Sequence, residues 1–132
     1  MPEVLIDNEF LTLWYHPQLQ VVHHRFHQFM YGEAFRDGLL RGVDALREYG
    51  ATKWLSDNRA SSAVHPQDRE WADSVWRPKA LSAGWRHWAI CPPSKVIGQM
   101  HMRDLVASYA ETGLNVALFD GPESALKWLA EQ

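Results

Sequence analysis

Three short apolar segments alternate along this chain with longer segments of helical periodicity, and this alternation most constrains the fold. The apolar segments are 52–56, 86–91 and 114–119. Each is short and bounded by turn-forming residues, which is typical of a buried strand. Strands that alternate with helices form a mostly parallel sheet with helices packed on its faces. The sequence therefore predicts an α/β fold.

Two further extended segments, 10–16 and 19–26, stand near the N-terminal end of the chain. Apolar and polar residues alternate within them, and the sequence His16-Pro17-Gln18 between them is typical of a tight turn. We expect these segments to form an antiparallel hairpin. The hairpin would make the predicted sheet mixed rather than purely parallel.

About four helices are predicted between and after these strands. The segment 31–49 has apolar residues at helical spacing, and Gly50 follows it as a stop signal. Pro66 begins the second helix, where a missing N–H costs nothing. We expect Pro78 to kink or interrupt that helix. The remaining two helices are predicted over about 101–112 and from 120–123 onward.

Length, charge and cysteine content narrow the class of protein. The chain has 132 residues, enough for one domain with its own core, and we assign residues 1–132 to a single domain. The net charge of -3 argues against a nucleic-acid partner. Cys91 is the single cysteine, so a reducing compartment is expected. The sequence shows neither a signal peptide nor the roughly 18 apolar residues of a membrane span, so we expect a cytoplasmic protein.

Seven tryptophans are the compositional outlier. So many indoles cannot all lie deep in a small core, and we expect some at a pocket wall, at a subunit interface or at the core edge. Trp71 and Trp76 stand on the second predicted helix. Together with Met30, Met100 and Met102 they could line an apolar cavity, although methionine also fills ordinary gaps in cores.

Polar side chains follow the apolar segment 52–56 at the point where its strand is expected to end. They are Asp57, Asn58 and Arg59. Sites in α/β proteins lie at the carboxyl ends of the strands, and Arg59 has the geometry to clamp a carboxylate or a phosphate. The alternative is that Asp57 and Arg59 pair with each other or cap neighbouring helices. The segment predicts a functional edge without specifying its chemistry.

The motifs of this chain do not support a metal site or a receiver-type phosphorylation site. A receiver aspartate at position 57 would need a pair of acids after the first strand to hold Mg²⁺, and His23-His24-Arg25 stands there instead. His23 and His27 share one face of a strand but lie about 13 Å apart along it, too far to share one ion. We therefore expect no metal ion and no cofactor.

Nucleophilic catalysis has equally little support. Ser61, Ser62 and His65 are close in the sequence, with Asp57 upstream, but such proximity is not the geometry of a triad. Cys91 has no adjacent base, and at a strand end it behaves as a small buried apolar group. The sequence therefore predicts a protein that is not an enzyme.

A set of motifs resembles one known family. The motifs are KWLSDNR, HPQDREW, WRPKA followed by Gly84, IGQM and FDGPESALKWL. In this order and spacing, from about residue 10 to the C-terminus, they are similar to the small SpoIIAA-like (STAS-type) proteins of bacteria. The resemblance implies a STAS-type α/β fold, and a regulatory or binding role rather than catalysis.

Two positions depart from the pattern of that family. Anti-sigma-factor antagonists of the wider fold carry a phosphorylated serine in an Asp-Ser-Ser-Gly pattern. That pattern does not occur around Asp57, Ser61 and Ser62, so we do not carry the phosphorylation site over. His65 stands where this branch often has a hydroxyl residue, which would cap the following helix better than imidazole.

The sequence as a whole predicts a cytoplasmic binding or regulatory module with a protein partner or a second copy of the chain as its ligand. The candidate contact residues are Asp57, Asn58, Arg59, His65, Trp71 and Trp76. The alternative is a carrier of a small apolar or lipid-like ligand, because STAS-type and lipid-transfer domains have been grouped by sequence resemblance. A carrier requires a pocket of a few hundred Å³. A third class, a hydrolase or transferase using Asp57, Arg59 and His65, lacks a visible activated nucleophile.

Overall fold

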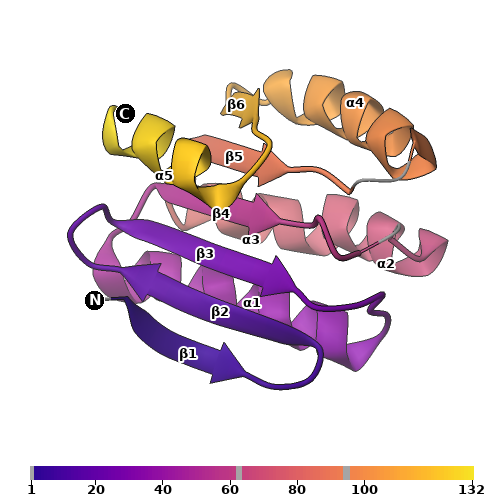
Figure 1. The fold of residues 1–132 in the computed structure, drawn as a ribbon, viewed down its shortest axis with the longest axis horizontal. Helices are drawn as coiled ribbons and strands as arrows, with labels where there is room; N and C mark the ends of the chain where they lie inside the picture. Colours follow the sequence, from indigo (N-terminus) through magenta and orange to yellow (C-terminus); the bar gives the residue numbers. More distant parts are fainter. Residues whose placement is uncertain (1, 62–63, 94–95) are drawn as a thin grey trace.

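A computed structural model describes residues 2–61, 64–93 and 96–132 of the chain, with the backbone alone described for 96–102. Within these residues the strands form one sheet in the order β1-β2-β3-β4-β5-β6 (Figure 1). The strands are β1 (Glu3–Asp7), β2 (Leu11–His16), β3 (Val21–Phe26), β4 (Lys53–Asp57), β5 (His87–Cys91) and β6 (Asn115–Leu118). The helices are α1 (Glu33–Tyr49), α2 (Pro66–Trp71), η1 (Ala72–Trp76), α3 (Arg77–Ser82), α4 (Val96–Ala110) and α5 (Pro122–Ala130).

The sheet is mixed, as the sequence predicts. β2 and β3 pair antiparallel, while β3, β4, β5 and β6 run parallel to one another. The predicted hairpin is confirmed, and a strand that the sequence did not predict, β1, extends it by pairing antiparallel with β2. β1 is half-exposed at the edge of the sheet, so it lacks the buried apolar pattern that marks the other strands.

The second helix differs from the prediction at Pro78. It continues from Pro66 to Ser82 without interruption, because the turn before the proline widens into the π-helical segment η1. There the Arg77 N–H donates to the carbonyl of Ala72, five residues back. A proline ring clashes with the preceding turn of an ordinary α-helix, and the wider turn relieves this clash. Such π-turns recur at functional sites.

The helices divide unequally between the two faces of the sheet. α1, α3 and α4 enclose the larger core, whereas α5 packs on β4 and β5 from the other side (Figure 1). The smaller core beneath α5 includes Val21, Leu55, Ala89 and Cys91. Among the described residues no helix combines the length and the apolar character needed to cross a membrane.

Aromatic rings fill the larger core. Trp54, Trp76, Trp85 and Trp88 are each at most 4% exposed, and they form a chain of ring contacts with Tyr109 at its end. Trp76 and Trp85 donate their indole N–H groups to backbone carbonyls. The other two indoles donate to polar side chains at the carboxyl ends of the strands, and these bonds define the site described next.

Candidate functional site

A pocket lies at the carboxyl ends of β3, β4 and β5, on the face covered by α1 and α4. Its volume is about 90 Å³, and its walls are mainly apolar. A single water needs roughly 10–15 Å³ in the same measure, so the pocket has room for a ligand about the size of one aromatic ring. The apolar and aromatic lining residues are Phe26, Phe35, Leu39, Val64, Ala72, Trp76, Trp88, Pro93, Leu105 and Tyr109. The polar ones are His24, Ser56, Asn58, Ser61, Arg69 and Asp73.

A chain of hydrogen bonds at the base of the pocket fixes which atoms face it. The Trp54 indole N–H donates to His24 Nδ1 at 3.0 Å, and indole nitrogen can only donate. His24 Nδ1 is therefore bare, and in the neutral ring Nε2 carries the proton. That N–H donates to Asn58 Oδ1 at 2.9 Å. Burial lowers the pKa of His24 to about 4, despite the opposing hydrogen bond to Asn58, so the ring is neutral at pH 7.

Ser56 stands beside this chain in the sheet. Strand pairing sets it next to His24, and its Oγ accepts the Trp88 indole N–H at 2.8 Å. Ser56 is 1% exposed, and its hydroxyl hydrogen meets no acceptor in the part of the chain that the structure describes. The same is true of the Asn58 amide hydrogens. The base of the pocket therefore holds hydrogen-bond donors that no described acceptor uses.

The wall opposite the strands comes from the π-turn. Ala72, Asp73 and Trp76 of η1 all line the pocket. Asp73 is held by Arg77 at 3.5 Å, and Arg77 in turn lies over the ring of Tyr109. Burial, with the Asp73 charge adding to it, raises the pKa of Tyr109 and keeps its phenol protonated.

Asp68 anchors the start of this wall. It is 2% exposed and accepts hydrogen bonds from the Gly32 N–H at 2.9 Å and from Arg36 Nε at 3.0 Å. These bonds tie α2 to the first turn of α1. Asp68 stands in the first turn of α2, so a single buried carboxylate joins two helices.

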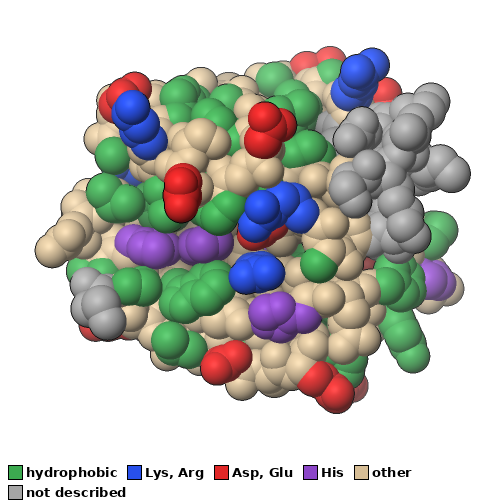
Figure 2. Space-filling model, in the orientation of Figure 1, with side chains coloured by type: hydrophobic (Ala, Val, Ile, Leu, Met, Phe, Trp, Pro, Cys, Tyr) green, Lys and Arg blue, Asp and Glu red, His purple; other side chains and the backbone are tan. Residues whose placement is uncertain are grey.

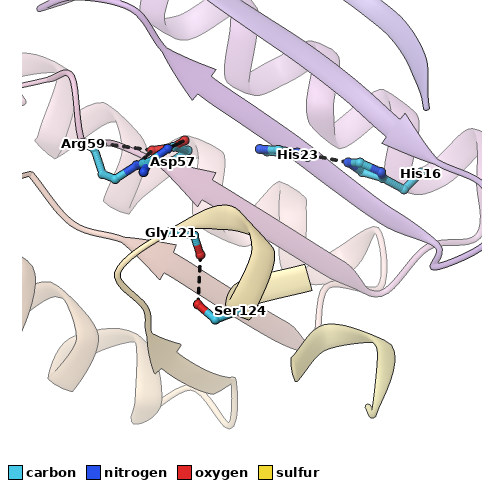
Figure 3. Close-up of polar contacts among 6 residues, drawn as sticks. All are labelled: His16, His23, Asp57, Arg59, Gly121 and Ser124. Carbon is cyan, nitrogen blue, oxygen red and sulfur yellow. Dashed lines mark hydrogen bonds and ion pairs between the residues drawn. The ribbon is translucent and has the colours of Figure 1, made fainter. Parts of the chain in front are cut away.

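The other face of the sheet presents a different polar cluster. Asp57 is 2% exposed and receives two parallel hydrogen bonds from Arg59, from Nε at 2.9 Å and from the Nη2 nitrogen at 2.8 Å (Figure 3). Burial alone would raise the pKa of Asp57, but the bonds from Arg59 outweigh it and the pKa lies below its usual range. This pairing is the structural alternative that the sequence left open.

His16 and His23 point toward each other on this same face (Figure 3). Their ring planes are nearly parallel, with an interplanar angle of 18°, and His16 Nε2 and His23 Nδ1 lie 3.0 Å apart. One nitrogen must donate to the other, so this head-to-head contact leaves no room for a metal ion between them. Figure 2 shows this face, where histidine side chains lie beside basic and acidic ones. Burial and the neighbouring His16 and His24 lower the pKa of His23 to about 3.

The six predicted contact residues therefore separate into four locations. Asn58 and Trp76 line the pocket. Asp57 and Arg59 pair on the opposite face. His65 is exposed and caps α2, because its Nδ1 accepts the Gln67 N–H at 3.2 Å.

The remaining candidate, Trp71, packs outside the pocket. Its ring lies against Phe35, with the guanidinium of Arg36 5.3 Å from its centroid. Met30 is buried in the larger core and does not line the pocket, while the side chains of Met100 and Met102 lie outside the described residues. The predicted methionine lining is therefore not found for Met30, and for Met100 and Met102 it stays a prediction.

Sequence reasoning missed His24, Ser56, Trp88 and Tyr109 as pocket residues. His24 and Ser56 carried a usable signal. Alternation along a strand places His24 on the same face as Phe26, and Ser56 on the same face as Trp54. Trp88 and Tyr109 needed the packing of β5 against α4, which no local pattern reveals. Ser62 lies outside the described residues, and Ser61 lines the pocket.

Within the described ranges, no three His, Cys, Asp or Glu side chains converge to hold a metal ion. Cys91 is buried, and burial raises the pKa of its thiol to about 11. No match to this chain is found among protein-family models, curated proteins or solved structures. The resemblance to SpoIIAA-like proteins therefore stays a prediction from the motifs.

Proposed function

We propose that this protein binds a small, mainly apolar molecule in the pocket between Trp76, Trp88 and Tyr109. The observation that carries the proposal is the aromatic pocket of about 90 Å³ at the carboxyl ends of parallel strands. Ligand sites in open α/β sheets lie at this position, and they combine apolar walls with a few convergent polar groups. The volume favours a ring-sized ligand over a long lipid chain.

The proposal also includes the class of protein that the motifs suggest, a binding module of the SpoIIAA-like (STAS-type) family. A STAS-type binding module in the cytoplasm, acting without catalysis, agrees with the mixed sheet, the buried protonated thiol of Cys91 and the neutral ring of His24. In such a module the pocket holds its ligand for delivery or sensing.

Titration with ethylbenzene tests the proposal, because this hydrocarbon has the size of the pocket and no polar group. Isothermal calorimetry should detect one site, with a dissociation constant of roughly 0.1–1 mM for a ligand of so few atoms. Ala72→Leu adds three carbon atoms to the pocket wall and should remove binding. The matched control is Ala107→Leu on the exposed side of α4, which should bind as the natural chain does.

Two results would contradict the proposal. One is the absence of ethylbenzene binding to the natural chain at the limit of the ligand's solubility. The other is equal binding by the Ala72→Leu variant, with thermal unfolding confirming that it is folded. Native mass spectrometry of the freshly purified protein gives a separate measurement of any natural ligand. Its mass would be present in the native spectrum and absent from the spectrum of the denatured protein.

A second candidate function is association with a protein partner or with another copy of the chain. It is favoured by Phe29 and Tyr31, which are 42% and 68% exposed and stack on each other in the connection between β3 and α1. Light scattering of the natural chain and of a Phe29→Ser variant tests self-association. A dimer that becomes a monomer in the variant supports this function, and a monomer in both contradicts a homodimer through this surface.

A further inference from the structure

We infer that the pocket selects ligands whose apolar body carries a carbonyl-type oxygen, which accepts hydrogen bonds from Ser56 and Asn58. The inference rests on the proposed function, since it names the chemical class of ligand for the same site. It follows from the direction of the hydrogen bonds at the base of the pocket.

The indole of Trp54 fixes the direction of the first series of hydrogen bonds, which runs from Trp54 through His24 to Asn58. Because Trp54 can only donate, His24 must accept at Nδ1 and donate at Nε2, and Asn58 must accept through Oδ1. The acceptor capacity of Asn58 is thereby directed at His24. Its amide nitrogen, which can only donate, is the polar atom left for a ligand.

The second hydrogen bond, from Trp88 to Ser56, runs in the same direction. The Trp88 indole donates to Ser56 Oγ at 2.8 Å, so the hydroxyl hydrogen of Ser56 turns away from Trp88. Both chains start at a buried indole N–H and end in a donor at the pocket. A ligand acceptor would satisfy these unused donor hydrogens, whereas a ligand donor would leave them unused and could bond only to the second lone pair of Ser56 Oγ or Asn58 Oδ1.

The walls add one further donor, Arg69, and one carboxylate, Asp73, which is already engaged by Tyr109 and Arg77. The phenol of Tyr109 donates weakly to Asp73 at 3.5 Å. Arg69, which also lines the pocket, forms no ion pair with a carboxylate in the described stretches of the chain. A buried donor without an acceptor is unfavourable, and a carbonyl oxygen that accepts from the buried Ser56 hydroxyl removes that cost on binding.

Calorimetry with acetophenone and ethylbenzene tests the inference, because the two probes differ by one C=O in place of one CH₂. Acetophenone should bind the natural chain about 3- to 10-fold more tightly, the gain expected for a neutral hydrogen bond.

Asn58→Asp reverses the polarity at one atom with little change in shape. The carboxylate still accepts from His24, but it now presents an acceptor where the amide presented donors. The preference for acetophenone should disappear in this variant and persist in the matched surface control Asn115→Asp. Thermal unfolding reports whether each variant is folded, and the comparison of probes on the natural chain needs no variant.

The outcomes separate the inference from the proposed function. Ethylbenzene that binds as tightly as acetophenone to the natural chain overturns the inference and leaves the proposed function standing. Binding of none of the probes overturns both. A preference for acetophenone that survives Asn58→Asp contradicts the role of the amide donors and overturns the inference as stated.

Discussion

Asp57 and Asn58 are neighbours in the chain, yet they end in opposite environments on the two sides of the sheet. On the α5 side, the Asp57 carboxylate accepts two hydrogen bonds from the Arg59 guanidinium. On the pocket side, Asn58 accepts one bond from His24 and keeps its donors available. The two strand-end side chains therefore differ: the Asp57 carboxylate is satisfied within the chain, whereas the Asn58 amide hydrogens meet no described acceptor. The α5 side is not wholly satisfied, because the buried His23 Nε2 has no hydrogen-bond partner among the described residues. The difference teaches that neighbouring polar residues at one strand end can serve separate roles, one in an internal ion pair and one at a pocket.

Acidification should give the largest effect on this comparison, because each side holds one neutral buried histidine. The pKa is about 3 for His23 and about 4 for His24, both below the ordinary 6.5. Below pH 6.5 the unfolded chain takes up protons that the folded chain refuses, so stability is complete above pH 6.5 and falls as the pH falls toward 4. At pH 5 the loss should be roughly 2 kcal/mol for each histidine.

Urea unfolding at pH 7 and pH 5 measures the total loss, and NMR titration of the histidine ring protons assigns it to the two sides. Protonated His24 can no longer accept from Trp54, so its titration should also shift the Trp54 indole signal. If His24 titrates near pH 6.5 in the folded protein, the result would contradict the hydrogen bonds from Trp54 to His24 and from His24 to Asn58, on which the polarity of the pocket depends.

Substitution of Gly42 should give the next largest effect. This glycine of α1 packs on the ring of Trp54, and a Cβ there would overlap the ring. Gly42→Ala should cost about 3 kcal/mol of unfolding free energy by overpacking and should displace Trp54 from His24. Gly38→Ala is the matched control, because its Cβ would meet only the flexible end of Leu11. Chemical denaturation of both variants measures the difference, and equal stability would contradict the close packing.

Asp57→Asn should have a smaller effect that is confined to its own side. The variant weakens the paired bonds to Arg59, and since Arg59 is partly exposed we expect a loss of about 1–2 kcal/mol rather than the larger cost of a fully buried pair. Its affinity for ethylbenzene should not change. A change of more than threefold in that affinity, measured by calorimetry, would mean that the two sides are coupled.

Much of the fold follows from local sequence patterns. The apolar segments, their turn signals and the stop at Gly50 predict the strands and α1 because strand alternation and helix termination are local properties. β1 was not predicted, because an edge strand is stabilised by its partner strand. The continuation of the helix through Pro78 was not predicted either, because it depends on the π-turn before the proline. These features require knowledge of neighbours that the pattern itself does not contain.

The candidate site could be predicted only in part. The polar strand end at Asp57-Asn58-Arg59 gives the correct edge of the sheet. The sequence grouped these residues on one contact face, whereas alternation sends Asp57 and Asn58 to opposite sides. The bond between His24 and Asn58 joins residues far apart in the chain and depends on the pairing of β3 with β4. The direction of that bond in turn depends on a buried indole.

The seven indole N–H signals provide the most direct test of the whole account, since they report on both sides of the sheet in one two-dimensional NMR spectrum. Acetophenone added to the natural chain should shift the signals of Trp76 and Trp88 and leave those of Trp14 and Trp128 unchanged. Trp14 packs on His23, and Trp128 packs on Phe119 near the smaller core. Shifts confined to Trp14 and Trp128, or no shift at saturating probe, would contradict the pocket as the binding site.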